Sequence, residues 1–424
     1  MNITIKTIAA SLLLTASALP AAAQDVLIKD AKVVTNSAAG ILEKGDILVQ
    51  NGVITKIADD LPAVAGVEII DGSNHWVTPG LFVPFSQLGQ VEISLESNAN
   101  DSRARDGKTS VSDRAADNFN PKTVVIGNSR VDGITHFVSV TGTGKSIFGG
   151  TGLVANTSGN FDSIEDDNAF VYMELGSNGA STAGGSRAAA LSQFRAALAD
   201  ASAYPARYDG PQDGDHLSRQ DAAALFGAAR GSVPFLIYAD RASDLLTIIG
   251  LKKDYGIDVI VVGAAESWMV ADELAAADIK VMVDPHDNLP DNFDMVGARE
   301  DNILMLDKAG VEYAIMTRSA DLSHNVRVIA QHAGNAVGNG LSWDKAFAAI
   351  TSTPSQWFGV KSGALNVGNK ANFVLWSGDP LEVTTAAKAM YIDGQSQDLV
   401  SRQTLLRDRY NPTTGDTRRH KYRN

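Results

Sequence analysis

The sequence predicts an α/β fold that is organised around a parallel sheet. From about residue 79 to residue 361, apolar runs typical of buried strands alternate with stretches of helical periodicity, which favours parallel strands joined by crossover helices. Short strand-like runs flank this region at both ends. The 424 residues, 44% of them hydrophobic and 20% charged, have an ordinary globular composition and leave room for a barrel and a smaller second domain.

The segment before residue 79 is expected to be all β. Val26–Val34 alternates apolar and polar side chains, as a half-buried strand does. Asn51-Gly52 separates two apolar runs and is typical of a tight β-hairpin turn, because both residues tolerate positive φ. After residue 362 the chain returns to β, with predicted strands that end near Trp376 and Gly394.

The central region supplies the repeated units. Its strand-like runs are residues 135–140, 170–173, 234–238, 259–262, 280–283 and 313–316. Helical patterns occupy residues 242–253 and 268–277. The pattern leaves open whether the sheet is open or closed, but eight units would suit a (β/α)8 barrel, whose functional groups follow the strands. The Gly- and Ser-rich stretches 149–159 and 177–186 are expected to be rim loops.

The first 23 residues have the pattern of an export signal. Lys6 precedes an apolar run from Ile8 to Leu19, and Ala21–Ala23 provides small residues for cleavage. About 12 apolar residues are too few to cross a bilayer, which needs roughly 20. We therefore expect a signal peptide, no membrane span, and a periplasmic or secreted protein.

Composition excludes several classes of chemistry. The chain has no cysteine, so disulfides, thiolate metal sites and cysteine nucleophiles are excluded, and any metal would depend on the seven histidines and the carboxylates. A formal net charge of −13 disfavours nucleic acid as a partner. The basic tail 407–424 is expected to be a frayed end.

Three parts of the sequence, in this order, carry a resemblance to a known family. They are Val77–Gln87 (VTPGLFVPFSQ), Asp132–His136 (DGITH), and the closing pair Ala348–Gly359 and Gly363–Trp376. The first looks like the family's PGLIDxHxH entry into the barrel, the second like its GVTT strand, and the third like its ATxNPAxxLGL…GxLxxGxxADLVV ending. The chain therefore resembles the amidohydrolase superfamily, nearest to its exported imidazolonepropionase-like members.

The resemblance implies a fold and a division of the chain. The fold is a metal-type (β/α)8 TIM-like barrel with a small β-sandwich that the N- and C-terminal segments build together. The implied boundaries are 24–78 for the first part of the sandwich, 79–361 for the barrel, and 362–424 for the second part and the basic tail.

The resemblance also implies a metal site. In catalytic members a His-x-His pair after strand 1, histidines after strands 5 and 6 and an aspartate after strand 8 hold a divalent ion, which lowers the pKa of bound water to roughly 7. Some members add a carboxylated lysine or a glutamate on strand 4. The corresponding positions here are Phe85 and Gln87, Tyr238, Val262-Gly263 and Arg318, with Glu174 as the strand 4 counterpart. Apart from Glu174 these are poor ligands, and a guanidinium repels a cation, so no cofactor is expected.

Three of these positions, Gln87, Tyr238 and Arg318, are instead predicted to line a binding pocket. Arg318 can bind a ligand carboxylate through two hydrogen bonds, or it can pair with a nearby acid on the rim. The sequence leaves both possibilities open.

A replacement metal site is the alternative to a metal-free pocket. Asp284, His286 and Asp287 follow a predicted strand and should lie on the active face. Asp321 and His324 follow the last strand and could converge with them. The same residues also suit a polar loop with helix caps. Three other histidines are expected to be packing or surface groups: His75, His136 and His216.

Two functions are consistent with this pattern. In the first, the protein is a metal-free small-molecule-binding protein or a partner subunit, as a homo-oligomer or in a hetero-oligomer with an active paralogue. In the second, it is an active hydrolase of carbon–nitrogen bonds in a cyclic amide or dipeptide-like substrate. The second would use zinc or another divalent metal at the replacement site, or metal-independent acid–base groups.

Overall fold

The computed structural model describes residues 24–106, 110–208, 216–318 and 322–411. The predicted signal peptide, Asp321 and residues 412–424 of the basic tail lie outside these residues. None of the helices within the described ranges is long and apolar enough to cross a membrane.

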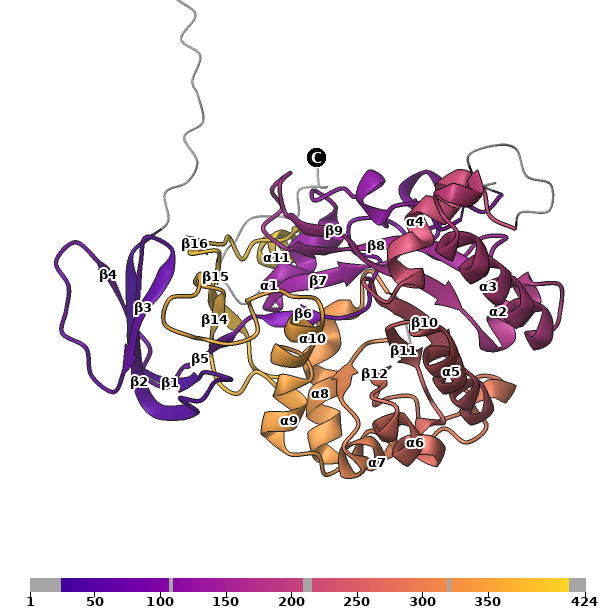
Figure 1. Cartoon of the computed structure of the whole chain (residues 1–424). Helices are drawn as coiled ribbons and strands as arrows, with labels where there is room; N and C mark the ends of the chain where they lie inside the picture. Colours follow the sequence, from indigo (N-terminus) through magenta and orange to yellow (C-terminus); the bar gives the residue numbers. More distant parts are fainter. Residues whose placement is uncertain (1–23, 107–109, 209–215, 319–321, 412–424) are drawn as a thin grey trace, which may run out of the picture.

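The two ends of the chain form one sheet, shown in indigo and yellow in Figure 1. Its order is β16-β15-β14-β5-β1-β2-β3, and β4 pairs with β1. The strands are β1 (Val26–Val34), β2 (Ile41–Gln50), β3 (Val53–Ala58), β4 (Glu68–Asp71), β5 (Trp76–Pro79), β14 (Phe373–Trp376), β15 (Ala387–Ile392) and β16 (Gln395–Ser396). The expected small β domain built from both termini is therefore present.

The hairpin predicted from Asn51-Gly52 is confirmed. Gln50 pairs with Val53 across the turn, and both turn residues have positive φ, 53° at Asn51 and 77° at Gly52. The local chemistry of two residues is sufficient to set the register of β2 against β3.

A second sheet of eight strands curls into the TIM-like barrel (Figure 1). Its order is β13-β12-β11-β10-β9-β8-β7-β6. The strands are β6 (Leu81–Val83), β7 (Ile134–Ser139), β8 (Phe148–Asn156), β9 (Ile164–Glu174), β10 (Phe235–Ala239), β11 (Val259–Gly263), β12 (Lys280–Val283) and β13 (Tyr313–Ile315). The edge strands β6 and β13 are joined through a connecting segment, because Phe82 N–H donates to Ile350 O at 2.8 Å and Ile315 N–H donates to Ala349 O at 3.0 Å.

The helices follow the strands along the chain and cover the outside of the barrel. They are α1 (Val124–Val131), α2 (Gly176–Thr182), α3 (Arg187–Ser202), α4 (Arg219–Ala229), α5 (Ala242–Tyr255), α6 (Ala271–Ala276), α7 (Asn302–Ala309), α8 (Ile329–Gly338), α9 (Trp343–Ala348), α10 (Ser352–Trp357) and α11 (Arg402–Tyr410). The two helices expected from periodicity, 242–253 and 268–277, correspond to α5 and to a 3-10 turn continued by α6.

The prediction for the glycine-rich stretch 149–159 was wrong. Residues Phe148–Asn156 are the strand β8, which is buried along its whole length and runs antiparallel to both β7 and β9. Its connections are too short for crossover helices, so the chain must reverse direction there. Its glycines are needed for close packing, because a Cβ at Gly152 would overlap the Phe170 ring. The loop expected at residues 177–186 was also wrong for most of its length, because residues 177–182 belong to the helix α2.

The barrel and the terminal sheet meet at Trp376 of β14. Its indole N–H donates to Thr78 Oγ1 at 2.9 Å, and its ring lies against Gly133, which has a φ of 83°. A side chain at residue 133 would overlap the indole and would also strain the backbone.

Gly133→Ala should therefore lower the free energy of unfolding by about 2 kcal/mol or more, because it combines overpacking with an unfavourable φ. Urea unfolding measures the effect. Gly127→Ala is the matched control, since this glycine lies in α1 with open space around its Cα. It should be neutral or stabilise by up to about 1 kcal/mol. Equal stabilities of the two variants would contradict the proposed packing.

Candidate functional site

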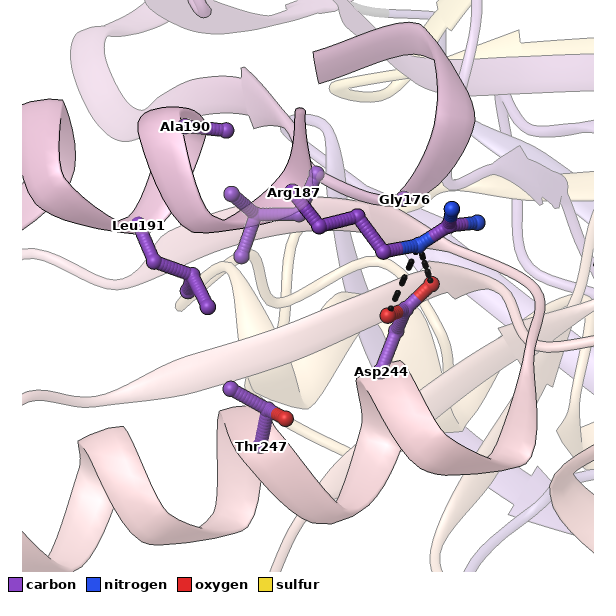
Figure 2. A pocket seen from close by; sticks show the side chains of 7 residues that line it. Gly176, Arg187, Ala190, Leu191, Asp244 and Thr247 are labelled. Carbon is purple, nitrogen blue, oxygen red and sulfur yellow. Dashed lines mark hydrogen bonds and ion pairs between the residues drawn. The ribbon is translucent and has the colours of Figure 1, made fainter. Parts of the chain in front are cut away.

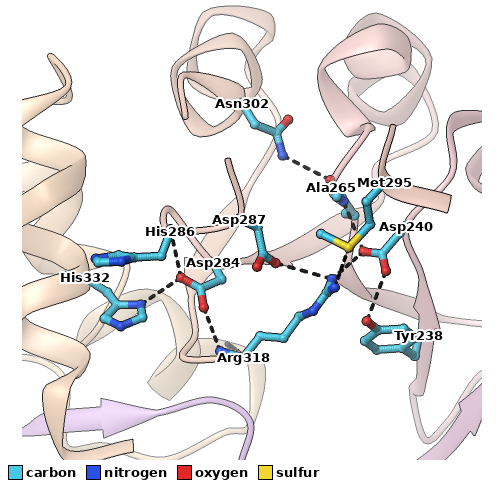
Figure 3. A network of polar contacts seen from close by, with 11 residues as sticks. Tyr238, Asp240, Ala265, Asp284, His286, Asp287, Met295, Asn302, Arg318 and His332 are labelled. Carbon is cyan, nitrogen blue, oxygen red and sulfur yellow. Dashed lines mark hydrogen bonds and ion pairs between the residues drawn. The ribbon is translucent and has the colours of Figure 1, made fainter. Parts of the chain in front are cut away.

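Strand alternation places polar side chains at the carboxyl-terminal ends of three barrel strands. Leu236, Met282 and Ala314 point into the apolar barrel interior. Tyr238 and Asp240 lie two and four residues after Leu236. Asp284 lies two residues after Met282, and Arg318 lies four residues after Ala314. Together with Asp287 and His332 these residues form what we call the mouth network (Figure 3).

Arg318 is the centre of the mouth network. Its Nη1 lies 2.7 Å from Asp240 Oδ1 and 3.3 Å from Asp287 Oδ2, and its guanidinium lies 5.5 Å from the centre of the Tyr238 ring. Its Nη2 donates to Met295 Sδ at 2.6 Å. Burial opposes the charge, but Asp240, Tyr238 and Asp287 outweigh it and raise the pKa of Arg318. The sequence left open whether Arg318 binds a ligand carboxylate or pairs with an acid of the protein, and in the structure it pairs with Asp240 and Asp287.

Asp284 is a fully buried carboxylate with several donors. Its Oδ2 accepts the backbone N–H of Arg318 at 2.7 Å, and its Oδ1 accepts the backbone N–H of His286 at 2.9 Å. His332 Nδ1, from α8, lies 2.7 Å from the same Oδ1. Burial alone would raise the pKa of Asp284, but His332 and the two backbone donors outweigh it and lower the pKa.

Asp287 is less well satisfied. Burial raises its pKa to about 7, and the charges of Asp284, Asp240 and Asp291 add to this rise against the opposing effect of Arg318. Its Oδ2 has the ion pair with Arg318 but no hydrogen bond among the described residues. One cation thus serves two carboxylates, and the second is left with a raised pKa.

Tyr238 completes the acidic side of the network. Its hydroxyl donates to Asp240 Oδ2 at 3.0 Å, and burial followed by the charge of Asp240 raises the pKa of Tyr238 well above its usual value. The hydroxyl therefore stays protonated and acts as a donor.

A second arginine ties the loops of the mouth together. Arg187 Nε lies 3.0 and 3.1 Å from the two carboxylate oxygens of Asp244, and its Nη2 contacts Asp294 (Figure 2). Asp294 Oδ2 also accepts the backbone N–H of Ser177 at 2.8 Å. The loops after β9, β10 and β12 are therefore joined by one guanidinium. The cavity beside it measures only about 10 Å³, so it has no room for more than a water molecule.

The predicted pocket residues occupy different places. Tyr238 and Arg318 lie together in the mouth network. Gln87 makes a backbone bond to Leu322 O at 2.7 Å and has no described contact with either of them. Phe85 packs against Tyr172 with ring centres 5.5 Å apart, and the Tyr172 hydroxyl donates to Glu174 Oε1 at 3.0 Å.

The described members of the predicted replacement metal site, Asp284, His286 and His324, do not form a metal-binding group. The His286 ring stacks on His332 with centres 4.2 Å apart, and its Nε2 contacts the Asn335 amide. His324 Nε2 lies 3.0 Å from Glu92 O. Asp321 lies outside the described ranges, and within them no three histidine, aspartate or glutamate side chains are grouped to hold a metal.

Sequence reasoning missed Asp240 and His332. It expected Asp287 on the active face but did not name it as a partner of Arg318. Asp240 could have been found, because it lies two residues after Tyr238 and period-2 alternation puts both on one face. His332 gave no local signal, since its partner Asp284 is 48 residues away. The prediction that His136 is only a packing or surface group was incomplete, because its Nε2 lies 2.9 Å from Glu165 Oε1.

Comparison with known proteins agrees with this architecture. Residues 258–402 match the profile of the Amidohydrolase family. The amidohydrolase tasK of Hapsidospora irregularis is 24% identical over 392 residues, which cover 83% of this chain and 40% of that protein. An amidohydrolase from Thermotoga maritima MSB8 superposes with a TM-score of 0.78 at 24% identity, over 88% of this chain and 99% of the other. Molinate hydrolase gives a TM-score of 0.55 at 14% identity, over 95% and 99%.

The family match over residues 258–402 and the shared fold define the class to which this chain is similar, the amidohydrolase superfamily. It spans less than half the length of tasK.

The divalent metal usual in this superfamily does not fit the mouth network. Arg318 places a guanidinium 2.7 Å from Asp240, so the charge that an ion would bring is already supplied. Asp284 is occupied by His332 and two backbone donors. A divalent ion at this position would meet a buried positive charge and too few free ligands.

Replacing Asp287 by Asn should change how stability depends on pH. Folding raises the pKa of Asp287 from 3.8 to about 7, so between these values the native state binds more protons than the unfolded chain. The contribution of this group to stability therefore falls as the pH rises through that window. Asp287→Asn should gain about 2–4 kcal/mol relative to the parent protein between pH 4 and 7.5, at about 1.4 kcal/mol per pKa unit.

Urea unfolding of both proteins at the two pH values measures this gain. Asp254→Asn is the control, because it removes an exposed acid near the end of α5 that does not act on Asp287, and it should show little change between the two conditions. A constant difference between Asp287→Asn and the parent protein at both pH values would show that Asp287 does not titrate in this window.

Proposed function

We propose that the protein is a metal-independent member of its superfamily that acts as a small-molecule-binding protein or as a partner subunit. The observation that carries this proposal is the Arg318–Asp240 ion pair, at 2.7 Å, in the position where the family's last metal-binding aspartate is expected. The guanidinium takes over the electrostatic role of an ion but has no open coordination position at which a water could be activated.

The charges of the mouth network indicate the kind of ligand. Arg318 faces Asp240, Asp284 and Asp287, so the acids exceed the one permanent cation. A ligand carboxylate would have to displace Asp240 or Asp287 from Arg318. The site therefore favours a neutral or positively charged ligand, and we propose this in place of carboxylate recognition.

A second candidate function rests on the Asp284–His332 pair. Asp284 holds His332 through Nδ1 at 2.7 Å, and no described residue bonds to His332 Nε2. An imidazole that a buried carboxylate orients in this way is the arrangement of a general base. Metal-independent hydrolysis of a carbon–nitrogen bond by His332 is accordingly the alternative to binding alone.

Location and assembly belong to the same proposal. The signal-like sequence 1–23 supports action after export, in the periplasm or outside the cell. Association with a second copy, or with an active paralogue, would give a role to a barrel that lacks the metal ligands.

Zinc binding tests the metal-independent assignment. The purified protein should contain less than about 0.1 equivalent of zinc, and added zinc should leave its Tm unchanged. Arg318→Gln removes the internal cation but leaves Asp240 and Asp287, so this variant should bind zinc at least about 10-fold more tightly than the parent and be stabilised by it.

Arg299→Gln is the matched control, because Arg299 pairs with Asp301 outside the mouth network, and it should not alter zinc binding. One equivalent of zinc in the parent protein, retained on dialysis and lost in Asp284→Asn, would refute the metal-independent assignment. If zinc is absent, His332→Ala separates the two candidate functions, since only the hydrolase requires that imidazole.

A further inference from the structure

A second polar site lies at the opposite end of the barrel from the mouth network. A solvent-accessible cavity of about 660 Å³ lies there between residues of the barrel and of the terminal sheet, and its size is in the range of small-molecule sites. The lining side chains that matter here are His136, Asn156, Asp162, Glu165, Lys361 and Lys370. His136 and Glu165 belong to the first halves of β7 and β9, whereas the mouth network follows the ends of its strands.

Three neighbouring strands contribute polar side chains to the barrel wall of this cavity. His136 of β7 is paired in register with Asn156 of β8. Glu165 of β9 accepts from Asn156 Nδ2 at 3.2 Å and lies 2.9 Å from His136 Nε2. Burial opposes the charge of Glu165, but His136 and Asn156 outweigh it and lower its pKa, so a carboxylate faces the cavity.

The stability of the fold does not explain why His136 occupies this position in the barrel wall. His136 is 1% exposed, and its Nδ1 is buried without a hydrogen-bond partner among the described residues. A buried polar atom without a partner destabilises the folded state, and an apolar side chain stacked on Phe82 would avoid that cost. The residues around His136 therefore point to a role beyond packing.

The facing side of the cavity carries two lysines, Lys361 and Lys370, from the segment that precedes β14. Lys370 Nζ lies 2.7 Å from Asp393 Oδ2 and still acts on Glu165, whose pKa it helps to lower. Lys361 is exposed and has no described ion pair or hydrogen bond. Asp162 adds a second acid beside Glu165 on the barrel wall. The cavity thus has an acidic side, formed by Asp162 and Glu165, and a facing side on which Asp393 pairs with Lys370 and leaves Lys361 as the lysine without a described partner.

We propose that this cavity binds a small zwitterion, with the ligand's ammonium group toward Glu165 and Asp162 and its carboxylate toward Lys361 and Lys370. A ligand with both charges satisfies the two walls at once, whereas a singly charged ligand leaves one wall uncompensated. Because the ligand would contact both the barrel and the terminal sheet, its binding would stabilise their junction. The proposal is independent of the chemistry at the mouth network.

Three probes of equal chain length test it on the full chain: 6-aminohexanoate, hexanoate and hexylamine. Isothermal titration calorimetry should give saturable one-to-one binding of 6-aminohexanoate, at least about 10-fold tighter than either singly charged probe. Glu165→Gln and Lys361→Met should each weaken 6-aminohexanoate binding by about 10-fold or more. Glu165→Gln should affect hexanoate less than hexylamine, and Lys361→Met should affect hexylamine less than hexanoate.

Lys253→Met is the matched control, since it removes an exposed lysine at the end of α5, away from the cavity, and should leave the affinity unchanged. Lys361 is exposed, so Lys361→Met is expected to fold even if Glu165→Gln does not. Equal affinity for the three probes, absence of saturable binding, or insensitivity to Lys361→Met would overturn the proposal. None of these outcomes depends on whether the mouth network binds zinc.

Discussion

The ion pair between Arg318 and Asp240 joins strands that are not neighbours in the sheet. Arg318 follows β13 and Asp240 follows β10, and β12 and β11 lie between them. A guanidinium can span these two strands only because the sheet curls and brings their ends together across the mouth. The pair therefore depends on barrel curvature, and it neutralises carboxylates that the same curvature forces into one small volume.

This constraint explains the state of the other groups in the mouth network. Asp240 and Asp287 share one cation, and burial raises the pKa of both carboxyls. Asp240 also has a short contact with Arg318 and the Tyr238 hydroxyl as a donor, both of which oppose that rise. The pKa of Asp284 is lowered instead, because two backbone N–H groups and His332 lie within hydrogen-bond distance of its carboxylate. Within the mouth network, the positive charge that faces the convergent acids Asp240 and Asp287 comes from the Arg318 side chain.

The accuracy of sequence reasoning differed between local and non-local features. The Asn51-Gly52 hairpin and the α5 helix were predicted correctly because each depends on residues close together in the chain. The strand β8 was misread as a loop, because Gly149, Gly150 and Gly152 have low strand propensity and their use becomes visible only against Phe170 and the neighbouring backbone. Likewise, Tyr238 and Arg318 could be placed at the mouth by alternation and motif, but Gln87 shares no contact with them.

The amino-acid sequence by itself determined the α/β class and the β-rich segments at both ends of the chain. These follow from hydrophobic period and turn chemistry, which are local properties. That the two ends form one small β domain was implied by the family resemblance, and the structure contains that domain. Only the tertiary structure decided what Arg318 binds, that His332 belongs beside Asp284, and that His136 and Glu165 face Lys370 across a cavity. Those contacts join residues far apart in the chain, and their energies depend on burial and distance that arise only once the barrel has curled and the terminal sheet has docked on it.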